Sequence, residues 1–317
     1  MANGFYTRRR FLAASAGAIA GLTLGAEEPA AVIDSHVHFY DPARPQDVPW
    51  PPRDDKFLYR TTLPKDYRAA EGARRVTGVV AVEASPWVED NQWVLDLAAR
   101  EPLIIGFVGN LAIGTKAFAG NLKRFAANRI FRGVRVRDRK LDGLLDDPDF
   151  AGDLKLLAAH DLSLDLAGGM EILPFARRLA EKMPGLRIII DHLAGLAING
   201  KAPPDDWARG MRALGRNPNI YCKLSGLVEG TGRGNGSPPR EVEFYRPALD
   251  AMRGIFGAER LMYASDWPVS ERFAPLPAVR RIVEEYFQSH GGAEIEAVFS
   301  RSAESAYRVT CSFKTGP

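Results

Sequence analysis

Two of the chain's five histidines lie one residue apart, in the stretch AVIDSHVHFYDP over residues 31–42, where an apolar strand pattern ends. Residues i and i+2 of a β-strand point to the same side, so His36 and His38 can converge on one point. Two convergent imidazoles bind a divalent metal, or they hold a water molecule and polarise a carbonyl oxygen. The alternative is a pair of unrelated structural histidines.

Eight short apolar runs alternate with longer helical patterns and predict the strands of one large domain. They cover residues 32–38, 76–84, 103–110, 131–137, 162–168, 186–192, 219–226 and 260–266. Several runs are apolar on both faces, as in a buried parallel sheet. Because SHVHFYDP, and not a glycine-rich phosphate turn, ends the first run, the pattern favours a (β/α)₈ TIM barrel over a doubly wound sheet.

Polar residues gather at or near the ends of these predicted strands, which form the catalytic face of such a barrel. They are His36, His38, Glu83, Arg135, Arg137, Asp165, His192, Lys223, Ser225 and Asp266. Two long connections, residues 39–66 and 227–240, open on the same face, and the second is glycine-rich enough to form a mobile lid. We therefore expect the active site at this end of the barrel.

Three cations at this face suit an acidic substrate. Arg135 and Arg137 alternate in phase on the fourth predicted strand, and Lys223 lies on the seventh. Guanidinium groups bind carboxylates in a two-pronged geometry, so these side chains are candidates to hold an anionic group of the substrate. The other interpretation for each is an ion pair inside the barrel, for example with Glu83 or Asp165.

The sequence resembles the amidohydrolase superfamily, and within it the lactonase-like branch that includes 2-pyrone-4,6-dicarboxylate lactonase, L-fuconolactonase and L-rhamnonolactonase. The resemblance covers essentially the whole mature chain. It is carried, in order, by VIDSHVHFYDP, VVAVEASPWVEDNQWVLDLA, FRGVRV, IIIDHLAG, NPNIYCKLSGLVEG and RLMYASDWPVS. It implies a hydrolase of small molecules that opens a lactone, of an anionic or sugar-acid type, by attack of a base-activated water.

The resemblance also implies catalytic roles. Asp266, followed by Trp267, matches the last-strand aspartate that takes a proton from the hydrolytic water. His192 matches a sixth-strand histidine that contacts the water or the substrate oxygen, and His36 and His38 complete the predicted catalytic set. The alternatives are a helix cap for Asp266 and a buried structural histidine for His192.

The need for a metal is open at this level. Metal-dependent relatives add a histidine on the fifth strand, where this chain has Asp165, and some add a carboxylated lysine or a glutamate on the fourth. The available ligands for one zinc or manganese ion are His36, His38, His192 and Asp266. The alternative is catalysis without a metal, in which imidazoles and cations polarise the ester carbonyl directly.

Departures from the branch's pattern limit the substrate prediction. Glu83 stands where relatives tend to have glutamine, and inside the mouth it would add a ligand or repel an anionic substrate. Trp87 is expected to line the pocket, with ordinary packing as its alternative. Two further functions stay open: a zinc-dependent decarboxylase or amide hydrolase of the same superfamily, and an exported binding protein without catalysis.

The N-terminus predicts export. TRRRFLAASAGAIAGLTLGA places Arg8 and Arg9 before a weakly apolar run rich in alanine and glycine. This pattern is typical of a twin-arginine signal over residues 1–30, ahead of a single barrel domain over residues 31–317. We expect a periplasmic or secreted protein without stable membrane association after export; a short membrane anchor or a basic tail is the alternative.

Composition excludes other classes of function. Lys and Arg number 42 against 39 Asp and Glu, a near balance that does not indicate a nucleic-acid or membrane surface. The two cysteines, Cys222 and Cys311, have no zinc-binding spacing. We expect a monomer or a homodimer acting on a small molecule.

Overall fold

The structure, a computed structural model, describes residues 1, 31–70, 76–137, 141, 143–234 and 238–311. Apart from Met1, the predicted export signal lies outside these residues, as does part of the predicted lid, and export stays a prediction. Within the described ranges, no helix combines the length and the apolar character that crossing a membrane requires.

Eight parallel strands form one sheet in sequence order. They are β1 Ile33–Val37, β2 Gly78–Val82, β3 Ile104–Gly109, β4 Phe131–Val136, β5 Ser163–Leu166, β6 Arg187–Ile190, β7 Ile220–Leu224 and β8 Leu261–Tyr263. The segment after β8 returns to β1, where the His38 amide donates to the Trp267 carbonyl at 2.8 Å. The sheet therefore closes on itself, and the predicted TIM barrel is confirmed.

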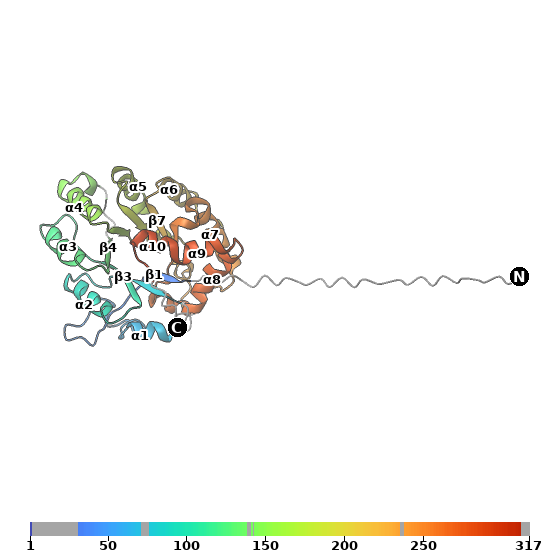
Figure 1. Cartoon of the computed structure of the whole chain (residues 1–317), viewed down its shortest axis with the longest axis horizontal. Helices are drawn as coiled ribbons and strands as arrows, with labels where there is room; N and C mark the ends of the chain where they lie inside the picture. The colour runs from blue at the N-terminus through green and yellow to red at the C-terminus, as the bar shows by residue number, and fades with distance from the viewer. Residues whose placement is uncertain (2–30, 71–75, 138–140, 142, 235–237, 312–317) are drawn as a thin grey trace.

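Helices surround the ring of strands (Figure 1). They are α1 Pro64–Ala69, α2 Glu89–Ala98, α3 Phe118–Ala126, α4 Pro148–Ala159, α5 Leu173–Lys182, α6 Asp205–Gly215, α7 Val242–Phe256, α8 Leu276–Gln288, α9 Gly292–Glu296 and α10 Ser302–Tyr307. In α6, for example, Trp207, Met211 and Leu214 are buried at helical spacing against the barrel. The Trp207 indole also donates to the Leu193 carbonyl at 2.8 Å, which ties α6 to the turn after β6.

The end of the barrel opposite the histidines is filled by apolar side chains. Ile33, Val80, Val108, Ile189 and Met262 belong to one buried cluster with Ala303, Ala306, Tyr307 and Val309 from the C-terminal part of the chain. Figure 1 shows α10 lying across the ring of strands. Because side chains and α10 fill this end, the polar groups of the barrel gather at the other end.

Close strand packing generates a stability prediction. A Cβ at Gly133 in β4 would clash with the Ser163 hydroxyl and lie 2.9 Å from the Ser163 carbonyl oxygen, whereas a Cβ at Gly152 in α4 would meet nothing within 4 Å. We expect Gly133→Ala to lower the free energy of unfolding by about 1–3 kcal/mol. Gly152→Ala should raise it by up to about 1 kcal/mol. Urea unfolding of both variants checks this, and equal effects would contradict the packing.

Candidate active site

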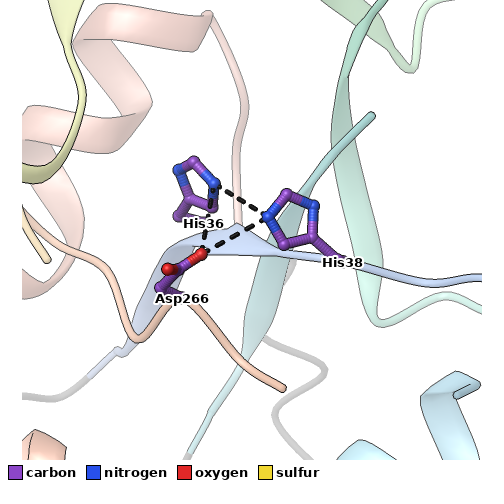
Figure 2. Close-up of side chains that lie close together, drawn as sticks. All are labelled: His36, His38 and Asp266. Atoms are coloured by element: carbon purple, nitrogen blue, oxygen red, sulfur yellow. Dashed lines mark hydrogen bonds and ion pairs between the residues drawn. The ribbon is translucent and has the colours of Figure 1, made fainter. Parts of the chain in front are cut away.

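The paired histidines of β1 converge at the barrel mouth (Figure 2). The Nε2 atoms of His36 and His38 lie 3.2 Å apart, and both side chains are buried. The pairing of β1 with β2 shifts register between Asp34 and Val37. In a regular strand, Ile33 and His36 would point to opposite faces because they are three residues apart. The register shift between them explains why both face the barrel interior.

Asp266, just after β8, completes the group drawn in Figure 2. Its Oδ1 lies 3.3 Å from His38 Nε2 and 3.6 Å from His36 Nε2. Burial alone would raise the pKa of Asp266, but His192, His38 and His36 outweigh burial and hold this pKa well below its usual range. The Asp266 backbone has a φ of 59°, and its amide donates to the His36 carbonyl at 3.0 Å. A left-handed backbone held in this way is typical of functional sites.

His192 reaches the same centre from the turn after β6. Its ring centroid is 4.5 Å from that of His36, its Nδ1 is 4.0 Å from Asp266 Oδ2, and Nδ1 lies 2.9 Å from the Ser225 hydroxyl. Gly226 permits this approach: its φ is 71°, and a Cβ there would lie 2.9 Å from His192 Cβ. The structure thus brings together all four residues predicted to be catalytic.

The protonation of His38 can be read from its partners. Nδ1 lies 2.9 Å from the Val82 carbonyl, which only accepts, so Nδ1 carries the proton and Nε2 presents a lone pair. Burial lowers the pKa of His38, although Asp266 acts in the opposite direction. The lone pair lies 3.2 Å from His36 Nε2 and 3.3 Å from Asp266 Oδ1, and Oδ1 has no hydrogen-bond partner among the described residues. A proton on His36 Nε2, or a bound cation, would separate these electron-rich atoms.

The donor set therefore fits a divalent cation. The ligand atoms of His36, His38 and Asp266 lie within 4.8 Å of one another, and those of His36, Asp191 and His192 form a second, overlapping group. Imidazole nitrogens and carboxylate oxygens are the ligands of catalytic zinc sites with an open position for water. All four predicted ligands belong to one or both of these groups.

Beneath His36 lies a buried ion cluster. The Lys223 ammonium is 2.6 Å from Asp165 Oδ2, 3.0 Å from Asp191 Oδ1 and 3.1 Å from His36 Nδ1. The Tyr307 hydroxyl donates to Asp165 Oδ2 at 2.6 Å. Lys223 has no exposed surface. The sequence allowed either substrate contact or an interior ion pair for Lys223. The structure shows the interior ion pair, which corrects the prediction that Lys223 contacts the substrate.

The two arginines of β4 are also paired. Arg135 Nε donates to Glu83 Oε1 at 2.7 Å, and Arg137 donates from Nε and Nη2 to the two Glu83 oxygens at 2.8 Å each. Glu83 thus pairs with both arginines, one carboxylate for two guanidinium groups, and belongs to neither group of residues that could hold a metal. The Arg135 side chain is 5% exposed, so it too belongs to the interior, whereas Arg137 is 47% exposed. Substrate contact stays a prediction for Arg137 and for Trp87, which is 41% exposed.

Sequence reasoning missed two acidic residues. Asp191 directly precedes His192, and Lys223 and His36 hold its pKa well below the usual range although burial opposes them. Glu229 lies in a short turn, Glu229–Thr231, on the connection after β7. Burial, and then the charge of Asp266, raises the pKa of Glu229 to about 8. The IIIDH motif contained a signal for Asp191, but no pattern distinguished Glu229 from a solvated loop residue.

An eight-stranded parallel barrel with a histidine–aspartate centre at its C-terminal mouth defines a barrel hydrolase. A protein-family model described as Amidohydrolase matches residues 33–309. The chain therefore belongs to the amidohydrolase family, as the resemblance implied.

Two curated relatives are similar over most of the chain. An L-fucono-1,5-lactonase of Burkholderia ambifaria is 33% identical over 75% of this chain and 80% of its own. Another, of Burkholderia multivorans, is 28% identical over 87% of this chain and 95% of its own. Among solved structures, an amidohydrolase from Burkholderia multivorans with bound zinc is 29% identical, with a TM-score of 0.75, over 89% of this chain and all of that chain.

The buried ion cluster generates a second prediction. Lys223→Met would leave Asp165 and Asp191 buried without their cation, and we expect a loss of about 3–5 kcal/mol in the free energy of unfolding. The matched control is Lys182→Met, because Lys182 pairs with Asp146 at 3.1 Å but is 48% exposed; its expected loss is below about 1 kcal/mol. Denaturant unfolding measures both, and equal small losses would show that the cluster does not stabilise the fold.

Glu229 generates a prediction of pH dependence. In the unfolded chain it loses its proton near pH 4.5, and in the folded protein only near pH 8. Between these values the folded state binds more protons, so this group stabilises the fold at low pH and the contribution is lost as pH rises. Glu229→Gln should therefore gain thermal stability relative to wild type between about pH 5 and pH 8. The melting temperatures of both proteins are measured across this interval. A difference between them that does not change with pH would contradict the raised pKa.

Proposed function

We propose that the protein is a lactonase that opens the ring of a sugar-acid lactone by attack of water on the carbonyl. One observation carries this proposal: Asp266 and the three histidines His36, His38 and His192 converge on one point at the barrel mouth. Relatives named as L-fucono-1,5-lactonases support the substrate class, because they match this chain over most of its length.

In the proposed reaction, Asp266 accepts the proton of the attacking water. Its lowered pKa keeps the carboxylate ionised at neutral pH, but it also makes the carboxylate a weak base. A weak base is more effective when the attacking water is more acidic. A divalent ion held by His36, His38 and Asp266 would lower the pKa of that water and polarise the carbonyl. His192, the most exposed histidine of the centre at 26%, is placed to contact the developing oxyanion.

We infer that one divalent ion belongs to this centre, held by His36, His38 and Asp266. Three observations support this: Asp266 Oδ1 has no hydrogen-bond partner among the described residues, the His38 lone pair points to the same place, and a related structure contains zinc. Metal-free action is the alternative, with Arg135 Nη1, 3.4 Å from His36 Nε2, as the nearest guanidinium donor. Metal analysis of the purified protein separates the two, and identifies zinc or manganese.

The candidate space for a small substrate is a cavity of about 330 Å³ lined by residues that include Asn110, Arg135 and Arg137. Arg135 connects it to the centre, because its Nη1 lies 3.4 Å from His36 Nε2. The cavity volume is at the lower end of the range for small-molecule sites, so it suits a single sugar ring and not an oligosaccharide.

The base assignment generates a direct prediction. Asp266→Asn should lower kcat on L-fucono-1,5-lactone by about 10²–10⁴-fold, because the amide cannot accept the proton. Asparagine tolerates the left-handed backbone, so the fold should be retained. Ring opening is followed by acid release at constant pH, with the spontaneous rate subtracted.

The matched control for Asp266→Asn is Asp146→Asn, whose side chain is 62% exposed in a surface ion pair. It should leave kcat unchanged. Full activity of Asp266→Asn would rule out the assigned base. Release of carbon dioxide from an aromatic acid, without any lactone opening, would indicate the decarboxylase chemistry of the wider superfamily instead.

A further inference from the structure

The barrel closes between β8 and β1 with little strand pairing. Each of the seven other pairs of neighbouring strands forms a parallel ladder. Between β8 and β1, the described residues form one isolated bridge, Val37 with Trp267. β8 itself has only three residues, Leu261–Tyr263, so Asp266 lies beyond the end of its strand. Other contacts must therefore hold Asp266 beside the histidines of β1.

The Asp34 carboxylate of β1 joins the two sides of this closure. Its Oδ1 accepts from the Ser265 amide at 2.8 Å and from the His36 amide at 3.3 Å. Its Oδ2 accepts from the Tyr67 hydroxyl of α1 at 2.8 Å. One side chain thus holds β1, the segment after β8 and α1 together. Ser265 directly precedes Asp266, so this contact reaches the backbone next to the proposed base.

The burial of Asp34 makes these hydrogen bonds its main compensation. The residue has no exposed surface, and the partners of its carboxylate are two backbone amides and a hydroxyl. A buried carboxylate is unfavourable unless donors satisfy it, and a fully satisfied buried polar group fixes the arrangement of the groups around it. An apolar side chain at this position could fill the same space, but it could not fix two backbone segments relative to each other.

The segment around Asp266 is held on both sides. The Trp267 amide donates to the Ser265 hydroxyl at 3.0 Å, and the Ser35 hydroxyl of β1 donates to the Tyr263 carbonyl at 2.7 Å. Asp266 needs such support, because its φ of 59° is unfavourable for a residue other than glycine and persists only where neighbouring contacts determine it. The Ser265 amide is the contact immediately before this residue, so its acceptor helps to determine where the Asp266 side chain points.

Asp34 itself does not face the reaction centre. Its carboxylate points to Tyr67, whose ring packs against that of Trp267 at 5.3 Å between centroids, in the buried cluster outside the strands. The preceding residue, Ile33, belongs to the cluster inside the barrel. Asp34 is therefore not placed to touch a substrate, and any effect that it has on the reaction passes through the residues that it holds.

We propose that Asp34 is a positioning residue: it holds the amides on the two sides of the barrel closure in one place and so sets the distance between the Asp266 carboxylate and His38. This distance is 3.3 Å between Asp266 Oδ1 and His38 Nε2. The inference rests on the proposed function for its kinetic test, whereas its structural test is independent of that function. A misplacement of about 1 Å between reacting groups lowers a rate by about 10²-fold.

The kinetic test uses Asp34→Ala, which removes all three contacts, and Asp34→Asn, whose Oδ1 can still accept from both amides. On L-fucono-1,5-lactone, Asp34→Ala should lose about 10–100-fold in kcat, with KM changed by less than about threefold, because the base moves while the substrate pocket stays. Asp34→Asn should keep kcat within about threefold of wild type. If Asp34→Ala does not fold, Asp34→Ser replaces it, since the shorter hydroxyl cannot reach both amides.

A double variant and a control distinguish positioning from a general loss of stability. If Asp34 acts through the base, adding Asp34→Ala to Asp266→Asn should lower the residual kcat by less than about twofold. The control is Asn219→Ala at the opposite end of the barrel, where the side-chain amide donates to the Met183 and Leu186 carbonyls at 3.2 and 2.9 Å. It should lower the melting temperature but keep kcat. An unchanged kcat in Asp34→Ala, or an equally large loss in the Asp266→Asn background, would overturn the proposal.

A crystal structure of Asp34→Ala tests the same inference without an activity measurement. We expect Asp266 Oδ1 to lie farther from His38 Nε2 than the 3.3 Å of the intact site, and Asp34→Asn to keep that distance. An Asp266 side chain that does not move in Asp34→Ala would overturn the inference and leave the proposed function unaffected. A displaced Asp266, in a protein whose wild type opens no lactone, would support the inference and contradict the proposed function.

Discussion

The buried ammonium of Lys223 is the constraint on which the catalytic end of the barrel depends. It joins Asp165 of β5, Asp191 after β6 and His36 of β1, all without solvent. In a low-dielectric interior each of these charges would be unfavourable alone, and together they compensate one another. Because the cluster contacts the Nδ1 side of His36, it leaves the Nε2 side of the ring facing His38 and Asp266.

The same balance of charge governs what the mouth can bind. Glu83 pairs with two guanidinium groups, while Asp266 Oδ1 and the Glu229 carboxyl have no hydrogen-bond partner among the described residues. The paired ions therefore stabilise the fold, whereas Asp266 keeps an acceptor atom available at the centre. His192 and Asp266 both have positive φ values, as is common where a fold positions reactive groups.

Much of the fold could be predicted from the sequence, because buried parallel strands and amphipathic helices have distinct periodicities. The position of the four catalytic candidates followed from the rule that barrel chemistry lies at strand ends. Ion pairs of the cations with Glu83 or Asp165 were one of two interpretations, and the sequence could not decide between them and substrate contact. Arg135 and Lys223 lie on strands whose order in sequence says nothing about which inward side chains meet across the barrel. The inward turn of His36 also depends on a register shift that no residue pattern marks.

Glu229 illustrates the remaining gap. Its neighbours EGTGRGNG are typical of a solvated loop, and only the packing against the connection after β6 buries its carboxyl. Burial of a loop side chain is a tertiary property, so a sequence pattern of local periodicity does not report it.

The most direct test of the central claim is a crystal structure of Asp266→Asn with a bound sugar lactone. The account predicts a lactone whose carbonyl lies beside residue 266, among His36, His38 and His192. A lactone bound away from these side chains would contradict it.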